Sequence, residues 1–276
     1  MHDSLSERDF ARMAGLIEGH CGIRMPPSKR VMVEGRLRKR LRALGLRDLT
    51  EYCRWVLDGD GFAEEFPCLI DAVTTNKTDF FREPDHFRLL RDMAVPTLLK
   101  AAGPDPLVKV WSAACSCGAE AYTIAMVLAD MSLGESRFGF SILGTDICTD
   151  VLEQAATAIY PADMVSPVPA DMRRRYLLRS RDPDRQEVRI VPELRRTARF
   201  MQMNLMAPTY PVDRDMDVIF CRNILIYFDR PTQQAVLDRL CRHLRPGGYL
   251  FLGHSESMAG ADLLLEQIAP TVFRME

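Results

Sequence analysis

The sequence predicts an all-helical region of about 75 residues followed by a larger α/β region, in which helices cover both faces of a mostly parallel β-sheet. Up to about residue 75, apolar side chains recur every three to four positions, which is the helical period. Beyond about residue 105, apolar strand-like runs alternate with helical patterns, as they do in doubly wound sheets. Small residues 112–118 follow one of these strands and Asp146 ends the next, which is where such sheets bind adenosine-bearing ligands.

The composition supports a globular protein without disulfides. With 276 residues and 47% hydrophobic content, the chain can bury the core of one large or two modest domains. The 36 lysines and arginines nearly balance 38 acids, so the net charge gives no reason to expect nucleic acid or a membrane surface as a partner. The eight cysteines are scattered, which indicates reduced thiols. The chain has neither a signal peptide nor an apolar run of about 18 residues, so we expect a cytoplasmic monomer without membrane insertion.

Three helical patterns make up the first region. Their apolar positions are Phe10, Met13 and Ile17 in the first, Val33, Leu37, Leu41 and Leu44 in the second, and Tyr52, Trp55 and Val56 in the third. Gly45 is expected to end the second helix, since glycine readily adopts the left-handed conformation found there.

The second helix carries a strongly basic outer face. A helical wheel centred on Leu37 turns the basic residues outward, namely Arg36, Arg38, Lys39 and Arg42, with only Glu34 nearby as a counter-charge. A solvated helix face explains this pattern, and so does docking to an acidic protein helix or a polyphosphate.

The α/β region contains seven strand-like runs and one irregular segment. The runs are residues 107–111, 138–143, 188–191, 199–203, 218–221, 249–253 and 271–275, with helical patterns at 119–131, 149–158 and 231–244. Residues 161–192 are rich in proline and arginine, and we expect an inserted subdomain over about residues 161–200. Residues 245–249 are expected to form a helix stop and a tight turn.

Polar side chains at the junction of the two regions suit a binding cleft. Asn76, Thr78 and Arg82 offer donors beside two phenylalanines that would pin the loop, and an arginine there could pair with a carboxylate. Helix capping by Thr78 or Asp79 is the competing explanation.

A second polar set follows the apolar strand at 218–221. Arg222 and Asn223 stand at its carboxyl end, where open α/β sheets bind ligands, and Tyr227 follows either as part of that site or as a core aromatic residue. The five histidines show no metal or triad spacing, and Cys115 and Cys117 fit a tight turn better than a zinc site. We therefore expect no metal and a reaction without a catalytic nucleophile.

Taken together in their order along the chain, these motifs resemble the chemotaxis receptor glutamate O-methyltransferases of the CheR type. The matching segments are Arg36 to Leu46, Thr74-Thr75-Asn76 with Phe80 to Glu83, Val110 to Ser116, Thr145-Asp146-Ile147, Asn204-Leu205, Phe220 to Asn223 and Ile226 to Asp229. One departure is Gly118-Ala119-Glu120-Ala121-Tyr122, where the family usually reads Gly-Glu-Glu-Pro-Tyr.

The resemblance implies a helical receptor-docking domain over residues 1–75, a linker and helix over 76–105 and a Rossmann-like methyltransferase domain over 106–276. By this resemblance the pocket for S-adenosylmethionine, or its product S-adenosylhomocysteine, is lined by Asn76, Thr78, Arg82, Glu120, Asp146, Asn204, Leu205, Cys221 and Arg222. Arg36, Lys39 and Arg42 would meet the acidic cytoplasmic helices of methyl-accepting chemoreceptors.

The expected chemistry is methyl transfer from S-adenosylmethionine to glutamate side chains. A sulfonium methyl group is already activated and a glutamate carboxylate is ionised at neutral pH, so the reaction needs positioning and desolvation more than a general base. We expect Asp146 to hold the ribose, Glu120 and Arg82 to fix the methionine end, and Arg82 with Tyr227 to act as the catalytic residues that orient the carboxylate.

Two other readings compete with this one. One is a methyltransferase of the same build that acts on a small molecule or a nucleic acid, although the near-neutral charge speaks against the latter. The other is a non-catalytic regulator of the same fold that senses S-adenosylmethionine or a nucleotide.

Overall fold

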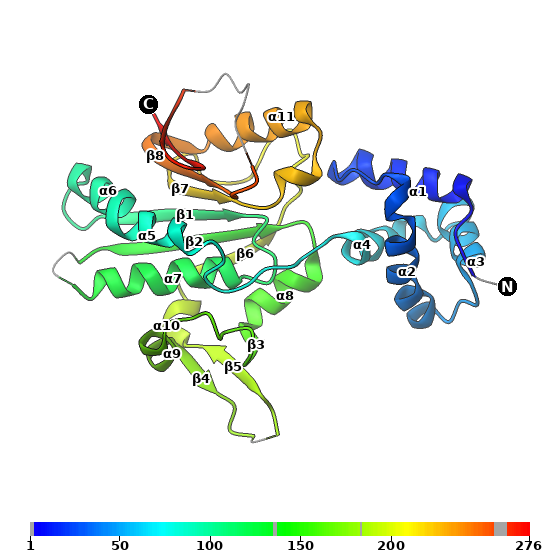
Figure 1. Ribbon diagram of the computed structural model, residues 1–276, viewed down its shortest axis with the longest axis horizontal. Helices are drawn as coiled ribbons and strands as arrows, with labels where there is room; N and C mark the ends of the chain where they lie inside the picture. Colours follow the sequence, from blue (N-terminus) through cyan, green and yellow to red (C-terminus); the bar gives the residue numbers. More distant parts are fainter. Residues whose placement is uncertain (1–2, 135–136, 183, 257–263) are drawn as a thin grey trace.

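The computed structural model describes residues 3–134, 137–182, 184–256 and 264–276. It has a helical part at one end and a sheet-based part that carries a small additional sheet (Figure 1). This architecture confirms the predicted fold class. Among the described residues, no helix combines the length and the apolar character that crossing a membrane would require.

The helical part contains four α-helices and two short helical segments among the described residues. They are α1 (Glu7–Cys21), η1 (Pro27–Lys29), α2 (Arg30–Leu44), α3 (Leu49–Cys53), η2 (Arg54–Asp58) and α4 (Phe62–Val73). The predicted apolar stripes meet in the core, where Met13, Leu37 and Leu69 are fully buried. Gly45 ends α2 in the left-handed conformation, as predicted.

The main sheet has seven strands in the order β6-β2-β1-β7-β8-β10-β9. They are β1 (Leu107–Ala113), β2 (Gly139–Asp146), β6 (Ala198–Gln202), β7 (Met216–Cys221), β8 (Leu244–Leu252), β9 (Leu265–Ala269) and β10 (Val272–Met275). The strands from β6 to β8 pair in parallel, whereas β10 pairs antiparallel with both β8 and β9. The strand order reverses at β1, between β2 and β7, so a crevice opens at the carboxyl ends of these strands.

Helices cover both faces of the main sheet (Figure 1). They are α5 (Pro84–Leu89), η3 (Leu90–Ala94), α6 (Val95–Ala101), α7 (Ala119–Ser132), α8 (Thr149–Thr157), α10 (Pro192–Arg195), η4 (Leu225–Tyr227) and α11 (Arg230–Cys241). Successive residues of β7 point to opposite faces: Phe220 packs into the core beside α7, and Ile219 into the core shared with α11 and the helical part. Because β7 is buried on both faces, its last four residues, 218–221, form a continuous apolar run.

The inserted subdomain is a three-stranded antiparallel sheet with one helix, and it is smaller than predicted. Its elements are β3 (Ile159–Pro161), α9 (Ala170–Tyr176), β4 (Leu177–Arg179) and β5 (Glu187–Ile190), with strand order β3-β5-β4. The expected end near residue 200 is wrong, because β6 pairs with β2 in the main sheet. The tight turn expected over residues 245–249 is also wrong, because this run lies within β8, whose pairing with β7 shifts register between Met216 and Val218.

Candidate functional site

A cavity lies at the carboxyl ends of the central strands and is closed on one side by the helical part. Counted with the open solvent at its mouth, the space between its lining residues is about 1030 Å³. The predicted residues that line it are Asn76, Thr78, Arg82, Glu120, Asp146, Asn204, Leu205, Arg222 and Tyr227. Segments far apart in the sequence therefore converge on one site.

Cys221 does not belong to this set, contrary to expectation. Its side chain is 0% exposed and packs in the apolar core beneath Arg222. A residue at the end of a fully buried strand points to one face of the sheet, and for Cys221 that face is the core.

Asp146 ends β2 with its carboxylate held by two backbone amides. Ser116 N donates to its Oδ2 at 2.8 Å and Cys148 N donates to its Oδ1 at 3.0 Å. The residue is 7% exposed, and burial raises the pKa of Asp146 although hydrogen bonds from the backbone of Cys148, Ser116 and Ile147 oppose the shift. A carboxylate has about four lone-pair directions, so these backbone amides leave acceptor capacity for a ligand in the cavity.

The small-residue turn after β1 brings the backbone close to the cavity. Ala114, Ser116 and Gly118 all have positive φ angles. A Cβ atom on Gly118 would lie 2.8 Å from the Cβ of Ala155, so no larger residue fits there. Ser116 Oγ donates to the carbonyl oxygen of Asn76 at 2.8 Å and thereby ties this turn to the junction loop.

Arg222 and Glu120 form a buried ion pair at the centre of the site. Arg222 Nε donates to Glu120 Oε2 at 2.6 Å, and Ser112 Oγ donates to Glu120 Oε1, also at 2.6 Å. Arg222 Nη1 also donates to the carbonyl oxygen of Arg82 at 2.8 Å, and the guanidinium lies over the ring of Phe87. Charged side chains this deeply buried require such partners, so β1, β7 and α7 are held in a fixed relation.

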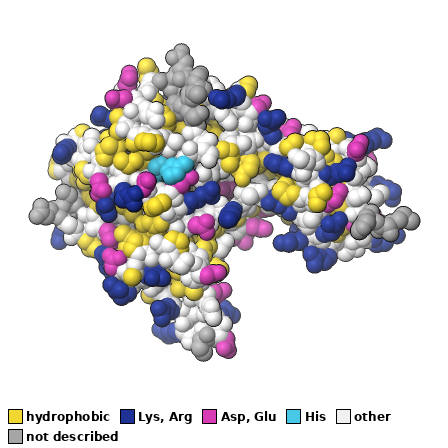
Figure 2. All heavy atoms as spheres, viewed as in Figure 1, with side chains coloured by type: hydrophobic (Ala, Val, Ile, Leu, Met, Phe, Trp, Pro, Cys, Tyr) yellow, Lys and Arg dark blue, Asp and Glu magenta, His cyan; other side chains and the backbone are white. Residues whose placement is uncertain are grey.

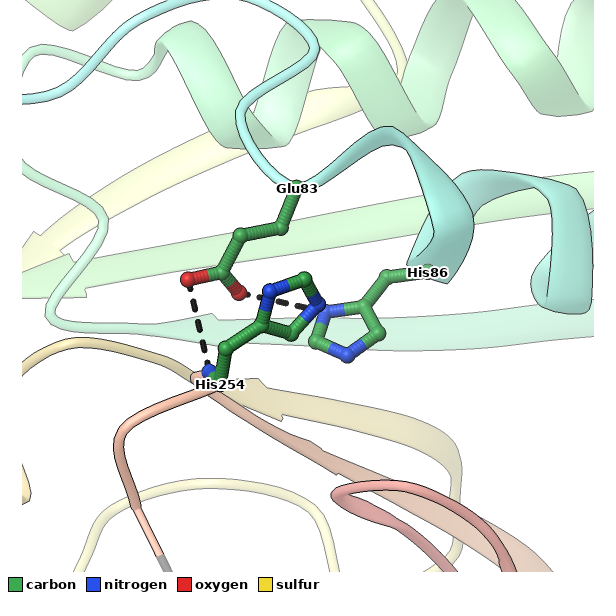
Figure 3. Close-up of side chains that lie close together, drawn as sticks. All are labelled: Glu83, His86 and His254. Atoms are coloured by element: carbon green, nitrogen blue, oxygen red, sulfur yellow. Dashed lines mark hydrogen bonds and ion pairs between the residues drawn. The ribbon is translucent and has the colours of Figure 1, made fainter.

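Glu83, His86 and His254 form a cluster beside Arg222, in which the Glu83 carboxylate faces both histidines (Figure 3). The histidines show no metal or triad spacing in the sequence, and this cluster forms because the fold brings together two of them that are 168 positions apart in the numbering (254 − 86). Their potential ligand atoms lie within 4.8 Å of one another. However, Arg222 Nη1 lies 3.3 Å from Glu83 Oε2 and 3.1 Å from His86 Nδ1.

The cation in this cluster is therefore Arg222. Glu83 and His86 hold its guanidinium in place. Burial, together with the charge of Arg222, lowers the pKa of His86 to about 4, so its ring is neutral near pH 7. The neutral ring accepts from Arg222 at Nδ1, which leaves Nε2–H to donate to Thr271 Oγ1 at 3.0 Å. Burial raises the pKa of Glu83, but the bond from Asn223 and the charge of Arg222 outweigh it and lower the pKa overall.

The junction loop is pinned much as the sequence suggested. Phe80 is fully buried and packs edge-on against Tyr160 at 5.0 Å, while Arg82 Nη1 donates to the carbonyl oxygen of Lys77 at 3.0 Å. The competing explanation, helix capping by Thr78 or Asp79, is wrong because Glu83 occupies the N-cap position of α5.

The helical part contributes residues to the cavity that sequence reasoning missed. Lys29 lines the wall with its Nζ 5.5 Å from the centroid of the Tyr227 ring, and Arg24 N donates to the carbonyl oxygen of Tyr227 at 3.0 Å. Tyr227 is half-buried between the core and the opening. No periodicity marks Lys29, which follows two prolines in a short segment, so the sequence carries no signal for it.

The basic face of α2 differs in one respect from the helical wheel. Lys39 and Arg42 are exposed as predicted, and basic side chains gather over the lower half of α2 in Figure 2. The outward placement of Arg36 is wrong: it is half-buried, and its Nη1 donates to the carbonyl oxygens of Val73 and Thr74, the latter at 2.6 Å. Arg36 thereby ties α2 to the end of α4.

The fold and the site together define a Rossmann-like S-adenosylmethionine-dependent methyltransferase. Residues 8–74 match the model of the CheR methyltransferase all-alpha domain, and residues 76–273 match that of the CheR methyltransferase SAM binding domain. The chain belongs to the CheR methyltransferase family, as its motifs predicted.

Close relatives cover nearly the whole chain. Chemotaxis protein methyltransferase 2 of Pseudomonas aeruginosa is 38% identical over 268 residues, which are 97% of this chain and 93% of the relative. The chemotaxis protein methyltransferase of Escherichia coli K12 is 39% identical over 272 residues, or 99% and 92% of the two chains. The corresponding protein of Salmonella typhimurium is 40% identical over 256 residues, or 93% and 86%. The family thus indicates S-adenosylmethionine-dependent methylation in chemotaxis.

The residues of the cavity fit S-adenosylmethionine. Asp146 retains acceptor positions suited to ribose hydroxyls, and the tight turn at Ser116 lets the backbone approach a ligand. The acidic Glu120 and the basic Arg82 offer opposite charges to an amino-acid end that carries both an ammonium and a carboxylate.

Proposed function

We propose that this protein transfers methyl groups from S-adenosylmethionine to glutamate carboxylates on the cytoplasmic helices of chemoreceptors, giving glutamate methyl esters. The single observation that carries the proposal is the convergence of Asp146, Glu120, Arg82 and Tyr227 on one cavity in a chain of this family. The printed names of the relatives, chemotaxis protein methyltransferases, support a substrate within chemotaxis.

Each residue has a defined role in the proposed reaction. Asp146 accepts hydrogen bonds from the ribose, Glu120 and Arg82 hold the charged methionine end, and Tyr227 with Arg82 orients the incoming carboxylate. Bound S-adenosylmethionine supplies a methyl group that its sulfonium already activates. The protein therefore contributes alignment and the exclusion of water, which is consistent with a site built of held ion pairs and hydrogen bonds.

The site also supports a reaction without a general base. A carboxylate oxygen of the glutamate donates its lone pair to the methyl carbon, and the electron pair of the broken carbon–sulfur bond remains on sulfur. No proton moves in this step. His86, which is neutral and fully engaged with Arg222 and Thr271, has no proton-transfer role in it.

The proposed receptor-docking surface is the exposed basic face of α2. Lys39 and Arg42 are available to an acidic receptor helix, and exposed Arg38 extends the same surface. Arg36, expected as a third contact, contributes by fixing α2 against the end of α4. Charge complementarity of this kind chiefly raises the rate of association and weakens with added salt.

The test is a methyl-transfer assay with labelled S-adenosylmethionine and purified cytoplasmic fragments of chemoreceptors from the same cell. We expect label on the fragment that mild base releases as methanol, because esters are base-labile. A fragment whose methylation-region glutamates are replaced by alanine is the matched control and should remain unlabelled. Label that resists base, or label on the alanine fragment, would contradict glutamate ester formation.

A further inference from the structure

Lys29 occupies a place in the cavity that the roles above leave unused. It ends η1 in the helical part, yet it lines the cavity, and its Nζ lies 5.5 Å from the centroid of the Tyr227 ring. Its Nζ donates to the carbonyl oxygen of Arg24 at 2.7 Å, and Arg24 N in turn donates to the carbonyl oxygen of Tyr227 at 3.0 Å. The helical part thus holds Tyr227 by both its ring and its backbone, with an ammonium group fixed beside it.

This ammonium has hydrogen-bonding capacity to spare. It carries three donors, and among the described residues only the Arg24 carbonyl accepts from it. No carboxylate in the described part of the chain forms an ion pair with it. Glu18, whose charge acts on Lys29, accepts a hydrogen bond from Met25 N. Burial, with the charges of Arg36 and Arg24, lowers the pKa of Lys29, whereas Glu18 opposes the shift.

The charges elsewhere in the cavity leave Lys29 free for an incoming anion. The carboxylates of Glu120 and Asp146 are held by Arg222, Ser112 and backbone amides. Lys29 lines the part of the cavity wall that the helical part forms. A partly buried cation without a counter-ion is stabilised when a carboxylate arrives, since the ion pair restores what desolvation costs.

We propose that Lys29 binds the carboxylate of the incoming glutamate and, with Tyr227, sets its position for attack on the methyl group. This inference rests on the function proposed above and assigns the helical part a direct place in the reaction, separate from docking through Lys39 and Arg42. In the step, one carboxylate oxygen gains the methyl group and loses its negative charge, while sulfur keeps the electron pair. Lys29 neither gains nor loses a proton.

The loss of charge on the glutamate during the reaction predicts how the contact with Lys29 affects KM and kcat. The carboxylate is fully charged when it binds and becomes a neutral ester, so the attraction to Lys29 is strongest before the transition state. An interaction of this kind lowers KM for the receptor more than it raises kcat. A purely structural role in holding Tyr227 would instead reduce kcat or destabilise the fold.

The test is Lys29→Met, which keeps an unbranched side chain over the Tyr227 ring and removes the charge. With a receptor fragment as substrate, we expect KM to rise about tenfold or more, as for a lost charged hydrogen bond, while kcat changes less than about threefold. Affinity for S-adenosylhomocysteine, measured by calorimetry, should stay within about twofold. Lys29→Arg should recover most of the lost affinity because it retains the charge, and Lys100→Met, at an exposed position on α6, should match the wild type.

The possible outcomes separate this inference from the proposed function. Unchanged KM in Lys29→Met, with an active wild type, would overturn the role of Lys29 alone. Parallel loss of S-adenosylhomocysteine affinity, or failure of Lys29→Arg to recover KM, would also overturn it, because either result shows that the charge is not what the substrate needs. A wild-type protein that labels no glutamate in any receptor fragment would overturn both proposals together.

Discussion

Replacement of Asp146 by asparagine tests the cofactor site at the residue with the most constrained geometry. The carboxylate accepts one amide hydrogen bond on each oxygen, from Ser116 N at 2.8 Å and Cys148 N at 3.0 Å. Asparagine has nearly the same volume but only one acceptor oxygen, so its amide NH₂ must face one of these N–H donors. Asp146→Asn therefore removes both the charge and the matched pair of acceptors without opening a cavity.

The expected loss of cofactor affinity follows from these contacts. Loss of a charged acceptor for buried hydroxyl donors costs about 1–3 kcal/mol, which corresponds to roughly 5- to 150-fold weaker binding. Stability is the weaker readout: one orphaned amide costs about 1–3 kcal/mol, but removal of a buried charge offsets part of it. The affinity for the cofactor therefore tests the role of Asp146, whereas the melting temperature does not.

Calorimetric titration with S-adenosylhomocysteine measures this affinity directly. Since burial raises the pKa of Asp146 and the ribose needs the ionised form, wild-type affinity should fall on acidification at a higher pH than an ordinary aspartate would give. The asparagine variant should lack this decline. Asp150→Asn, an exposed acid in the first turn of α8, is the matched control. Equal affinities for wild type and Asp146→Asn would refute the assigned role.

Three further predictions address other parts of the structure. Alanine at both Lys39 and Arg42 should slow receptor methylation several-fold and make its rate less sensitive to added salt, while the affinity for S-adenosylhomocysteine stays unchanged. A wild-type rate that does not depend on salt would rule out electrostatic docking. Arg36→Met removes the hydrogen-bond donors of two carbonyl groups at the end of α4, and it should lower the free energy of unfolding, measured in urea, by about 1–3 kcal/mol. A free energy equal to that of the wild type would show that these hydrogen bonds do not stabilise the fold. The pKa of about 4 for folded His86 lies below the unfolded value, so the folded state binds fewer protons. The free energy of unfolding should therefore fall by up to about 3 kcal/mol as the pH drops from about 6.5 to 4. His86→Gln should lack this decline, and an identical dependence on pH in the variant would contradict the prediction.

Sequence periodicity predicted the fold class because the long helices and the central strands bury continuous apolar faces. The helical stripe through Leu37 and the apolar run 218–221 before Arg222 both lie where their patterns indicated. The subdomain boundary failed because β6, a strand of mixed burial, carries no clear alternation. The sequence alone could not assign it to the main sheet rather than to the insertion.

The site was predictable where it follows chain geometry and not where it depends on tertiary contacts. Asp146 ends β2 and Arg222 directly follows β7, and the carboxyl ends of these parallel strands meet at one edge of the sheet. A helical wheel gives the direction of Arg36 from its own axis but not which neighbouring helix end lies there. His86 and Lys29 reach the site through packing between distant segments, and no local pattern encodes such contacts.

A crystal structure of the protein with S-adenosylhomocysteine would test the central assignment most directly. We expect the ribose hydroxyls within hydrogen-bonding distance of Asp146, the amino-acid end between Glu120 and Arg82, and the sulfur facing the open side of the cavity towards Tyr227 and Lys29. Density for the adenosyl group away from Asp146, or a sulfur turned into the core, would contradict the account.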